Sequence, residues 1–392
     1  MDFQLTDEQK LLRETARDFA EAELAPKAAS IDQNETFPID AMKKMAALGF
    51  TGMTIPEPYG GTDMGNVALS IVLMEINRAC ASTGVTLSVH CSLASSPIVR
   101  FGSDAQKKKY LPRMASCELL GAYSLTEPGS GSDSAALRTR AVKDGANWRL
   151  TGTKNWVTSG SHAGVIIVFA RTSDPEDPKK PHKGITAFLV EPTFKGFAVG
   201  KHEEKMGIRG STSVELILDG CVVPDENILG PVGEGFRVAM DTLDGGRIGI
   251  ASQAVGIAEA CLDASVKYAK EREQFGQPIG HFEAIQWKIA DMAARLEASR
   301  LLTFRAAELR DRKEPCSHAS AMAKLMASTT ANFCGREAVQ IHGGAGYTVD
   351  FPVERYMRDA RITELYEGTT EIQRLVIARH YLGSPRVADA RG

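Results

Sequence analysis

The chain has 392 residues, of which 43% are hydrophobic and 24% charged, and such a chain can bury a large core without disulfides or metal staples. Its 46 Lys and Arg residues and 49 Asp and Glu residues leave a net charge of −3, which argues against a nucleic-acid-binding protein. No apolar run approaches the ~18 residues of a membrane span. The seven cysteines form no CxxC and the eight histidines form no HxxxH or HExxH, so we expect reduced, buried thiols and no metal site of neighbouring ligands.

The first segment of the chain, residues 1–120, reads as a helical domain. A helix begins at Thr6, where Thr6 and Gln9 form a capping box, and its apolar positions recur at helical spacing. Three further helices are predicted over 39–48, 68–81 and 105–115.

The second segment, residues 121–231, reads as an antiparallel β domain. Short β-branched or alternating runs are separated there by Gly, Pro, Asp and Lys. Val214, Leu216 and Leu218 alternate with more polar residues, so one face of this strand should meet a core.

The third segment, residues 232–392, returns to a helical period. An apolar stripe continues for about seven turns over 284–313, and a second helix is predicted over 319–341. Long antiparallel helices that share an apolar face form a bundle, so the whole chain is predicted to be an α+β protein with helical, β and helical parts in that order.

Several common catalytic signatures are absent from the sequence. There is no GxxxxGK[ST] and no GxSxG. The glycines at Gly233 and Gly235 resemble part of a dinucleotide-binding loop, but they follow a Pro-containing loop and not a strand, so they indicate a loop-to-helix turn.

Two glycine-rich segments could hold a polar ligand through backbone N–H groups. The segment 123–133 combines hydroxyl side chains with glycines where helix gives way to strand, and an interdomain loop is the alternative. The segment 340–346, QIHGGAG, follows a helix, and its glycines could equally be a helix C-cap.

Single residues leave further alternatives open. Trp156 could be a core residue or a ligand contact, and Arg272 could be no more than a charged helix end. Glu364, Glu367 and Glu371 surround a Gly-Thr-Thr turn, where a carboxylate could act as a base once water is excluded, or could be a surface charge.

Taken in order, seven strings cover nearly the whole chain and resemble the acyl-CoA dehydrogenase family of flavoenzymes, most closely its short-chain, butyryl-CoA-type branch. The strings are AYSLTEPGSGSD, KNWVTSG, MGIRGSTSVELILDGCVVP, TLDGGRIGIASQAVGIAEACLDA, EREQFGQPI, QIHGGAGY and YMRDARITELYEGTTEIQR. The resemblance implies that the C-terminal domain is a four-helix bundle.

The resemblance also implies a reaction. A base removes the α-proton of an acyl-CoA thioester while hydride leaves the β-carbon for flavin N5, which gives a trans-2-enoyl-CoA. Glu367 matches the family's catalytic Glu, and its backbone N–H together with a flavin ribityl hydroxyl would hold the thioester oxygen. Gly246 stands where isovaleryl- and long-chain-type relatives carry their base, which favours Glu367 here.

The same matching implies two sets of binding residues. Those expected at acyl-CoA are Ser132, Asp244, Gly245, Gly246, Arg247, Tyr366 and Gly368. Those expected at FAD are Tyr123, Leu125, Thr126, Gly131, Ser132, Trp156, Val157, Thr158, Arg272, Phe275, Gln340, Ile341, His342, Gly343, Gly344, Thr369, Thr370 and Glu371. In this reading Arg272 meets the pyrophosphate, and Phe275 and the 340–344 segment reach FAD from a neighbouring subunit. Relatives commonly have Gln where Glu283 stands, which leaves its contact with FAD in doubt.

The implied protein is a homotetramer that passes electrons to an electron-transfer flavoprotein and binds neither nucleic acid nor membrane. A Met1 close to the first helix favours the bacterial cytoplasm, with the mitochondrial matrix as the alternative for a processed protein. Three other readings remain open: a branched-chain or other specialised acyl-CoA dehydrogenase, an oxygen-using flavoenzyme of the same fold, and a non-catalytic helical scaffold.

Overall fold

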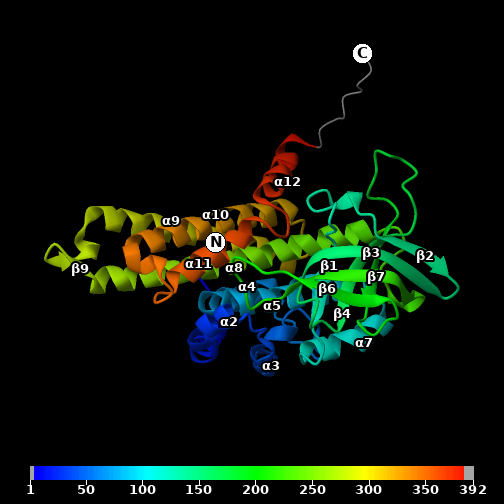
Figure 1. Cartoon of the computed structure of the whole chain (residues 1–392), viewed down its shortest axis with the longest axis horizontal. Helices are drawn as coiled ribbons and strands as arrows, with labels where there is room; N and C mark the ends of the chain where they lie inside the picture. Colours follow the sequence, from blue (N-terminus) through cyan, green and yellow to red (C-terminus); the bar gives the residue numbers. More distant parts are fainter. Residues whose placement is uncertain (1–3, 384–392) are drawn as a thin grey trace, which may run out of the picture.

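The computed structural model describes residues 4–383. Helices of the N-terminal segment lie beside the long C-terminal helices, and a β domain packs against one end of this helical part (Figure 1). The N-terminal helices are α1 Asp7–Phe19, α2 Ala28–Asn34, α3 Ile39–Ala47, α4 Gly65–Ala79, α5 Ala81–Ser88, α6 Ser96–Phe101 and α7 Asp104–Ala115.

The predicted helix starts are confirmed by their caps. Thr6 accepts a hydrogen bond from the backbone N–H of Gln9 at 3.2 Å, and the Gln9 side chain accepts one from the Thr6 N–H. Helix α5 and the π-helix Val89–Ser95 were not predicted from the sequence, because they are buried on all sides and have no amphipathic period. The six-residue helix α6, which is only partly buried, was not predicted either.

The β domain is one sheet in the order β6-β7-β3-β2-β4-β5-β8, with β1 paired to β4. Most pairs are antiparallel as predicted, but β4 lies parallel to β1 and to β2. The strands are β1 Gly121–Ser124, β2 Arg140–Asp144, β3 Asn147–Thr158, β4 Val165–Arg171, β5 Ile185–Val190, β6 Phe197–His202, β7 Ser213–Pro224 and β8 Ile228–Leu229.

The sheet is buried on both faces at β4 and β5. Val165, Ile167 and Phe169 face helices α6, α7 and the start of the next helix, while their neighbours on β4 face β3 and β7. The predicted alternation in β7 is confirmed, because Val214, Leu216 and Leu218 are buried and the residues between them are not.

Three long helices form the C-terminal part. The helix α8 begins at Gly235, so Gly233 and Gly235 are the predicted loop-to-helix turn, and its 37 residues span roughly 55 Å. A short hairpin of β9 Glu273–Gln274 and β10 Gln277–Pro278 follows at the end remote from the β domain (Figure 1). The remaining helices are α9 Glu283–Asp311, α10 Ser317–His342, α11 Val353–Arg361 and α12 Thr370–Leu382.

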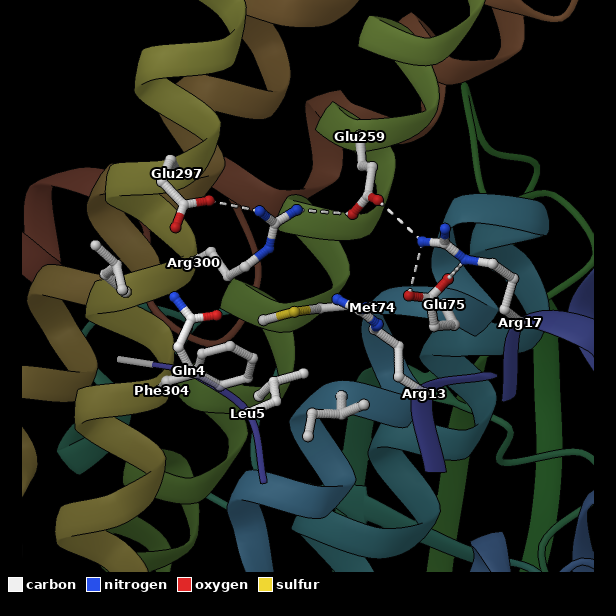
Figure 2. Close-up of a pocket in the computed structure, with 12 residues that line it drawn as sticks. Gln4, Leu5, Arg13, Arg17, Met74, Glu75, Glu259, Glu297, Arg300 and Phe304 are labelled. Atoms are coloured by element: carbon white, nitrogen blue, oxygen red, sulfur yellow. Dashed lines mark hydrogen bonds and ion pairs between the residues drawn. The ribbon is translucent and has the colours of Figure 1, made fainter. Parts of the chain in front are cut away.

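A row of ion pairs joins the N-terminal helices to the C-terminal ones beside a cavity of about 350 Å³ (Figure 2). Arg17 on α1 contacts Glu75 on α4 at 2.8 Å and Glu259 on α8 at 3.1 Å. Arg300 on α9 also contacts Glu259, at 2.8 Å, and contacts Glu297 at 2.6 Å. The row ties four helices from the two ends of the sequence into one body.

The thiol prediction is confirmed, because all seven cysteines are buried and free. Within residues 4–383 no helix is both long enough and apolar enough to span a bilayer. The same residues hold no group of three or more His, Cys, Asp or Glu that could ligate a metal ion.

Candidate active site

Glu367 lies in the turn before α12, and its side chain points at α8. A Cβ built on Gly246 would stand 2.0 Å from Glu367 Oε2, so the carboxylate rests directly on the bare backbone of that glycine. Both carboxylate oxygens are buried and accept no hydrogen bond from the described residues. Burial raises the pKa of Glu367 to about 7, although Lys324 and Arg247 act in the opposite direction.

The backbone of this turn is strained and is held by two side chains. Glu367 has a φ of 53°, which is unusual for a residue with a Cβ. Gln373 donates to the Gly368 carbonyl at 2.7 Å and to the Glu367 carbonyl at 3.3 Å, and the Lys324 ammonium on α10 also donates to the Gly368 carbonyl. Neither Lys324 nor Gln373 was predicted from the sequence, because one helical Lys or Gln carries no local signal.

Of the predicted acyl-CoA residues of α8, Gly246 and Arg247 lie beside Glu367, whereas Gly245 faces Arg310. Arg247 is buried and donates to Asp244 at 2.6 Å, and Asp244 also accepts from Ser317 at the start of α10. Burial raises the pKa of Asp244. Tyr366 donates to Gln253, two turns further along α8, so a side-chain hydrogen bond fixes the turn that carries the carboxylate to this helix.

Residues of two other elements face the same carboxylate. Leu93 of the π-helix Val89–Ser95 stands 2.6 Å from the Cβ built on Gly246, and Tyr123 on β1 is close enough for the Glu367 charge to raise its pKa, an effect second to burial. Sequence reasoning missed Leu93. A π-helix commonly marks a functional position, but its sequence has no signature.

A second group of predicted residues meets at the end of β3. The register between β3 and β7 shifts between Lys154 and Val157, and Trp156 has a φ of 60° and is 59% exposed. The N–H of Asn155 donates to the Thr126 carbonyl at 2.9 Å, so the 123–133 loop lies against β3, the strand that carries Trp156. The bulge thereby turns a large ring to the surface beside the 123–133 loop.

A buried ion pair beneath this loop was not predicted. Lys154 is fully buried and contacts Glu127 at 2.8 Å, and it also donates to the Leu125 carbonyl at 3.1 Å. Glu127 accepts the N–H groups of Arg138 at 2.6 Å and Thr139 at 2.9 Å. Burial lowers the pKa of Lys154 to about 8, although Glu127 opposes that shift.

The end of β3 fits a flat, polar-edged ring system such as a flavin. Trp156 offers an exposed aromatic face, and Thr158 follows it. Asn155 Oδ1 and Ser159 Oγ are buried polar atoms without a hydrogen-bond partner among the described residues. Buried orphan groups of this kind are expected where a ligand completes the hydrogen bonding.

Other predicted cofactor residues are not brought to this place. Phe275 is 93% exposed, and Arg272 lies three residues before it at the remote end of α8, roughly 40 Å along the helix from Gly246 (Figure 1). Gln340, Gly343 and Gly344 are exposed at the end of α10, and a Cβ built on either glycine would meet nothing within 4 Å. Glu283, whose contact was in doubt, begins α9 beyond the same hairpin.

The side chains of three predicted residues are used for packing. Val157 is part of the β-domain core, Ile341 is part of the helical core, and His342 is buried with its ring stacked on Tyr268 at 4.2 Å. These side chains cannot contact a surface ligand in this arrangement, which leaves only their backbone groups for such a role.

The other predicted positions lie around the two groups. Leu125 is buried, and Gly131 and Ser132 are exposed in the loop after β1. Thr369 is the N-cap residue of α12, which begins at Thr370, and Glu371 accepts from Thr370 at 3.0 Å.

The structure thus has one buried carboxylate that accepts no hydrogen bond from the described residues, and an exposed indole with orphan polar atoms at the end of β3. Family models of acyl-CoA dehydrogenase match the chain with the N-terminal domain over residues 6–118, the middle domain over 122–221 and the C-terminal domain over 233–382. The chain belongs to the acyl-CoA dehydrogenase family, whose members are flavoproteins and oxidoreductases. The expected fold is confirmed.

Short-chain enzymes are among the relatives of the chain. It is 51% identical over 383 residues to the mitochondrial short-chain specific acyl-CoA dehydrogenase of Mus musculus. The aligned part is 98% of this chain and 92% of that protein. It is 42% identical to butyryl-CoA dehydrogenase of Megasphaera elsdenii, with a TM-score of 0.94 over 97% of this chain and 100% of that one. A chain from a structure described as "Electron transferring flavoprotein of Acidaminococcus fermentans: Towards a mechanism of flavin-based electron bifurcation" is 46% identical, with a TM-score of 0.95 over 98% and 100% of the two chains.

Proposed function

We propose that this enzyme oxidises short-chain acyl-CoA thioesters to trans-2-enoyl-CoA with FAD, and that Glu367 removes the α-proton. The observation that supports this most is the Glu367 carboxylate, which is buried, accepts no hydrogen bond from the described residues and has a pKa raised to about 7. A carboxylate without hydration or hydrogen bonds is a stronger base toward a weak carbon acid.

FAD would be held by the Thr126 segment and by Trp156 and Thr158, and when bound it supplies the hydride acceptor for the β-carbon. The chain itself contributes the orientation of the ring, through the exposed indole of Trp156 and the orphan amide oxygen of Asn155. The backbone N–H of Glu367 would hold the thioester oxygen, so one strained turn would carry both the base and the oxyanion donor.

A short acyl chain is supported by the likeness to short-chain specific and butyryl-CoA dehydrogenases. Leu93 closes the space over Gly246, and the hydrogen bond from Tyr366 to Gln253 crosses two turns further along α8. Two turns of helix are roughly 11 Å, so this bridge lies beyond a four-carbon chain and does not by itself set the chain length. A branched-chain substrate is the alternative, which a comparison of butyryl-CoA with isobutyryl-CoA decides.

The remote group at the hairpin implies a second subunit. Arg272, Phe275 and Gly343 cannot reach Trp156 of their own chain, so we propose that they complete the FAD site of a neighbouring copy in a homotetramer. We propose an electron-transfer flavoprotein as the acceptor, in keeping with the structure in which the related Acidaminococcus fermentans chain occurs. A bacterial cytoplasm or a mitochondrial matrix would suit this function.

The proposal is tested by comparing Glu367→Gln with Glu364→Gln, a nearby carboxylate that pairs with Arg361. We expect Glu367→Gln to retain FAD and lose turnover of butyryl-CoA by several orders of magnitude, as loss of an essential base does. Glu364→Gln should stay within a few-fold of the parent enzyme. Near-normal turnover by Glu367→Gln would contradict the assignment of Glu367 as the base.

A further inference from the structure

Lys324 is a buried cation whose surroundings set it apart from the other charges near the active site. It projects from the first half of α10, its side chain has an exposed fraction of 0%, and its ammonium donates to the carbonyl of Gly368. Gly368 directly follows Glu367, so the lysine touches the turn that carries the proposed base. A buried ammonium costs free energy unless it is compensated, and its retention here calls for a physical reason.

The charges around Lys324 leave it without a matched partner. Its surroundings hold Glu367, Arg247, Glu364 before the turn and Glu371 on α12, but within residues 4–383 it forms no direct ion pair. Arg247, the other cation near Glu367, is paired with Asp244 at 2.6 Å. The charge of Arg247 is therefore largely neutralised, whereas that of Lys324 acts on the Glu367 carboxylate.

Glu367 itself is faced by few other ionisable groups. They are Lys324 from α10, Arg247 from α8, Tyr123 from β1 and its own neighbour Tyr366. Burial raises the Glu367 pKa, and of the two cations that oppose the shift, Lys324 has the larger effect. Both tyrosines are half-buried, their pKa values are raised chiefly by burial, and they stay neutral in the range where Glu367 titrates.

We propose that Lys324 is a positioning residue for the dehydrogenation, which holds the strained Glu367 turn through the Gly368 carbonyl and places a positive charge beside the carboxylate. The inference rests on the proposed role of Glu367 as the base. It gives the buried cation two effects, one through a hydrogen bond and one through its charge, and the structure offers variants that separate them.

Gln373 supplies the matched comparison, because it donates to the same carbonyl at 2.7 Å but carries no charge. Gln373→Met removes hydrogen bonds to the Gly368 and Glu367 carbonyls but no charge. Lys324→Gln removes the charge and retains a donor, and Lys324→Met removes both. A base must be ionised to accept a proton, so kcat/KM for butyryl-CoA falls as pH drops below the Glu367 pKa of the free enzyme.

The experiment measures kcat/KM for butyryl-CoA against pH with FAD-loaded enzyme, together with flavin content and Tm. We expect both Lys324 variants to shift the acid limb of the profile upward by roughly one pH unit or more, the effect of losing an opposite charge nearby. Gln373→Met should lower kcat with the acid limb unmoved. Lys324→Arg, which retains the charge, should keep the limb closer to that of the parent than Lys324→Met does.

An acid limb that is the same in Lys324→Gln, Lys324→Met and the parent would overturn the inference, as would an equal shift in Gln373→Met. If Lys324→Met does not fold, Lys324→Gln still gives the answer, because it keeps the donor to Gly368. The Glu367→Gln enzyme distinguishes this failure from that of the proposed function. If Glu367→Gln turns over normally, Glu367 is not the base. If Glu367→Gln is inactive but the Lys324 variants have the same acid limb as the parent, only the proposed role of Lys324 is rejected.

Discussion

At the scale of single residues, the position of the Glu367 carboxylate depends on the lack of a side chain at Gly246. The carboxylate of Glu367 occupies the place a side chain of residue 246 would take, since a Cβ there would lie 2.0 Å from Oε2. A base carried by α8 and a base carried by the turn before α12 therefore compete for one position. In this chain the glycine leaves that position to Glu367.

This competition predicts that the base can be moved. Glu367→Gly should abolish turnover, and adding Gly246→Glu should raise it by about tenfold or more, because a carboxylate from α8 then enters the vacated space. Leu93 must shift, since its Cδ2 lies 2.6 Å from the new Cβ, but it is the end of a flexible side chain. The measurement is turnover of butyryl-CoA, with Gly246→Ala in the Glu367→Gly background as the control. A folded, flavin-loaded double variant no faster than this control would contradict the prediction.

At the scale of elements, the strand end that carries Trp156 is fixed from below by an ion pair. Lys154 on β3 and Glu127 in the loop after β1 are both buried and lie 2.8 Å apart. Further N–H groups complete the hydrogen bonding of Glu127. Removal of one partner from such a pair leaves an uncompensated buried charge, which is more costly than removal of both.

Lys154→Met should therefore lower Tm by several degrees and weaken FAD retention, because the 123–133 loop loses its attachment to β3. The double variant Glu127→Gln/Lys154→Met should recover part of both losses, since no unpaired charge remains. Thermal unfolding and the flavin-to-protein absorbance ratio give the answer. A single variant as stable as the parent, or a double variant no better than the single one, would show that the pair does not hold the loop.

At the scale of the whole molecule, the long helices separate two groups of proposed FAD contacts. Trp156 lies on β3 and the Glu367 turn contacts Gly246 of α8, whereas Arg272 and Phe275 lie at the hairpin, roughly 40 Å along α8 from Gly246. Figure 1 shows the β domain and this hairpin at opposite ends of the long helices. A cofactor that needs both groups must bind between two copies of the chain. In a symmetric pair the contact would occur twice.

Two inactive variants should therefore complement each other. One subunit carries Glu367→Gln and the other carries Arg272→Met with Phe275→Ala, and the two are co-expressed with different tags. In a mixed pair one site has both defects and the other has none, so about half the sites should be active. Turnover of the doubly purified species is the measurement. Activity no higher than that of the two separate variants would mean that each site belongs to one chain.

The sequence allowed prediction of the elements whose pattern is local. The capping box at Thr6, the alternation in β7 and the turn before Gly235 are all set by neighbouring residues, and the structure has them as expected. The π-helix at Val89–Ser95 could not be predicted, because burial on every side removes the period. Lys324, Gln253 and Lys154 were missed for a different reason: each is significant only through a partner far away in the sequence.

The central claim is that this chain oxidises a short acyl-CoA with a bound flavin, and anaerobic mixing of the purified enzyme with butyryl-CoA tests it most directly. The account predicts a yellow protein whose flavin absorbance bleaches with butyryl-CoA, less with octanoyl-CoA, and not at all in Glu367→Gln. A yellow protein that no acyl-CoA bleaches, or a protein that cannot take up FAD, would contradict it.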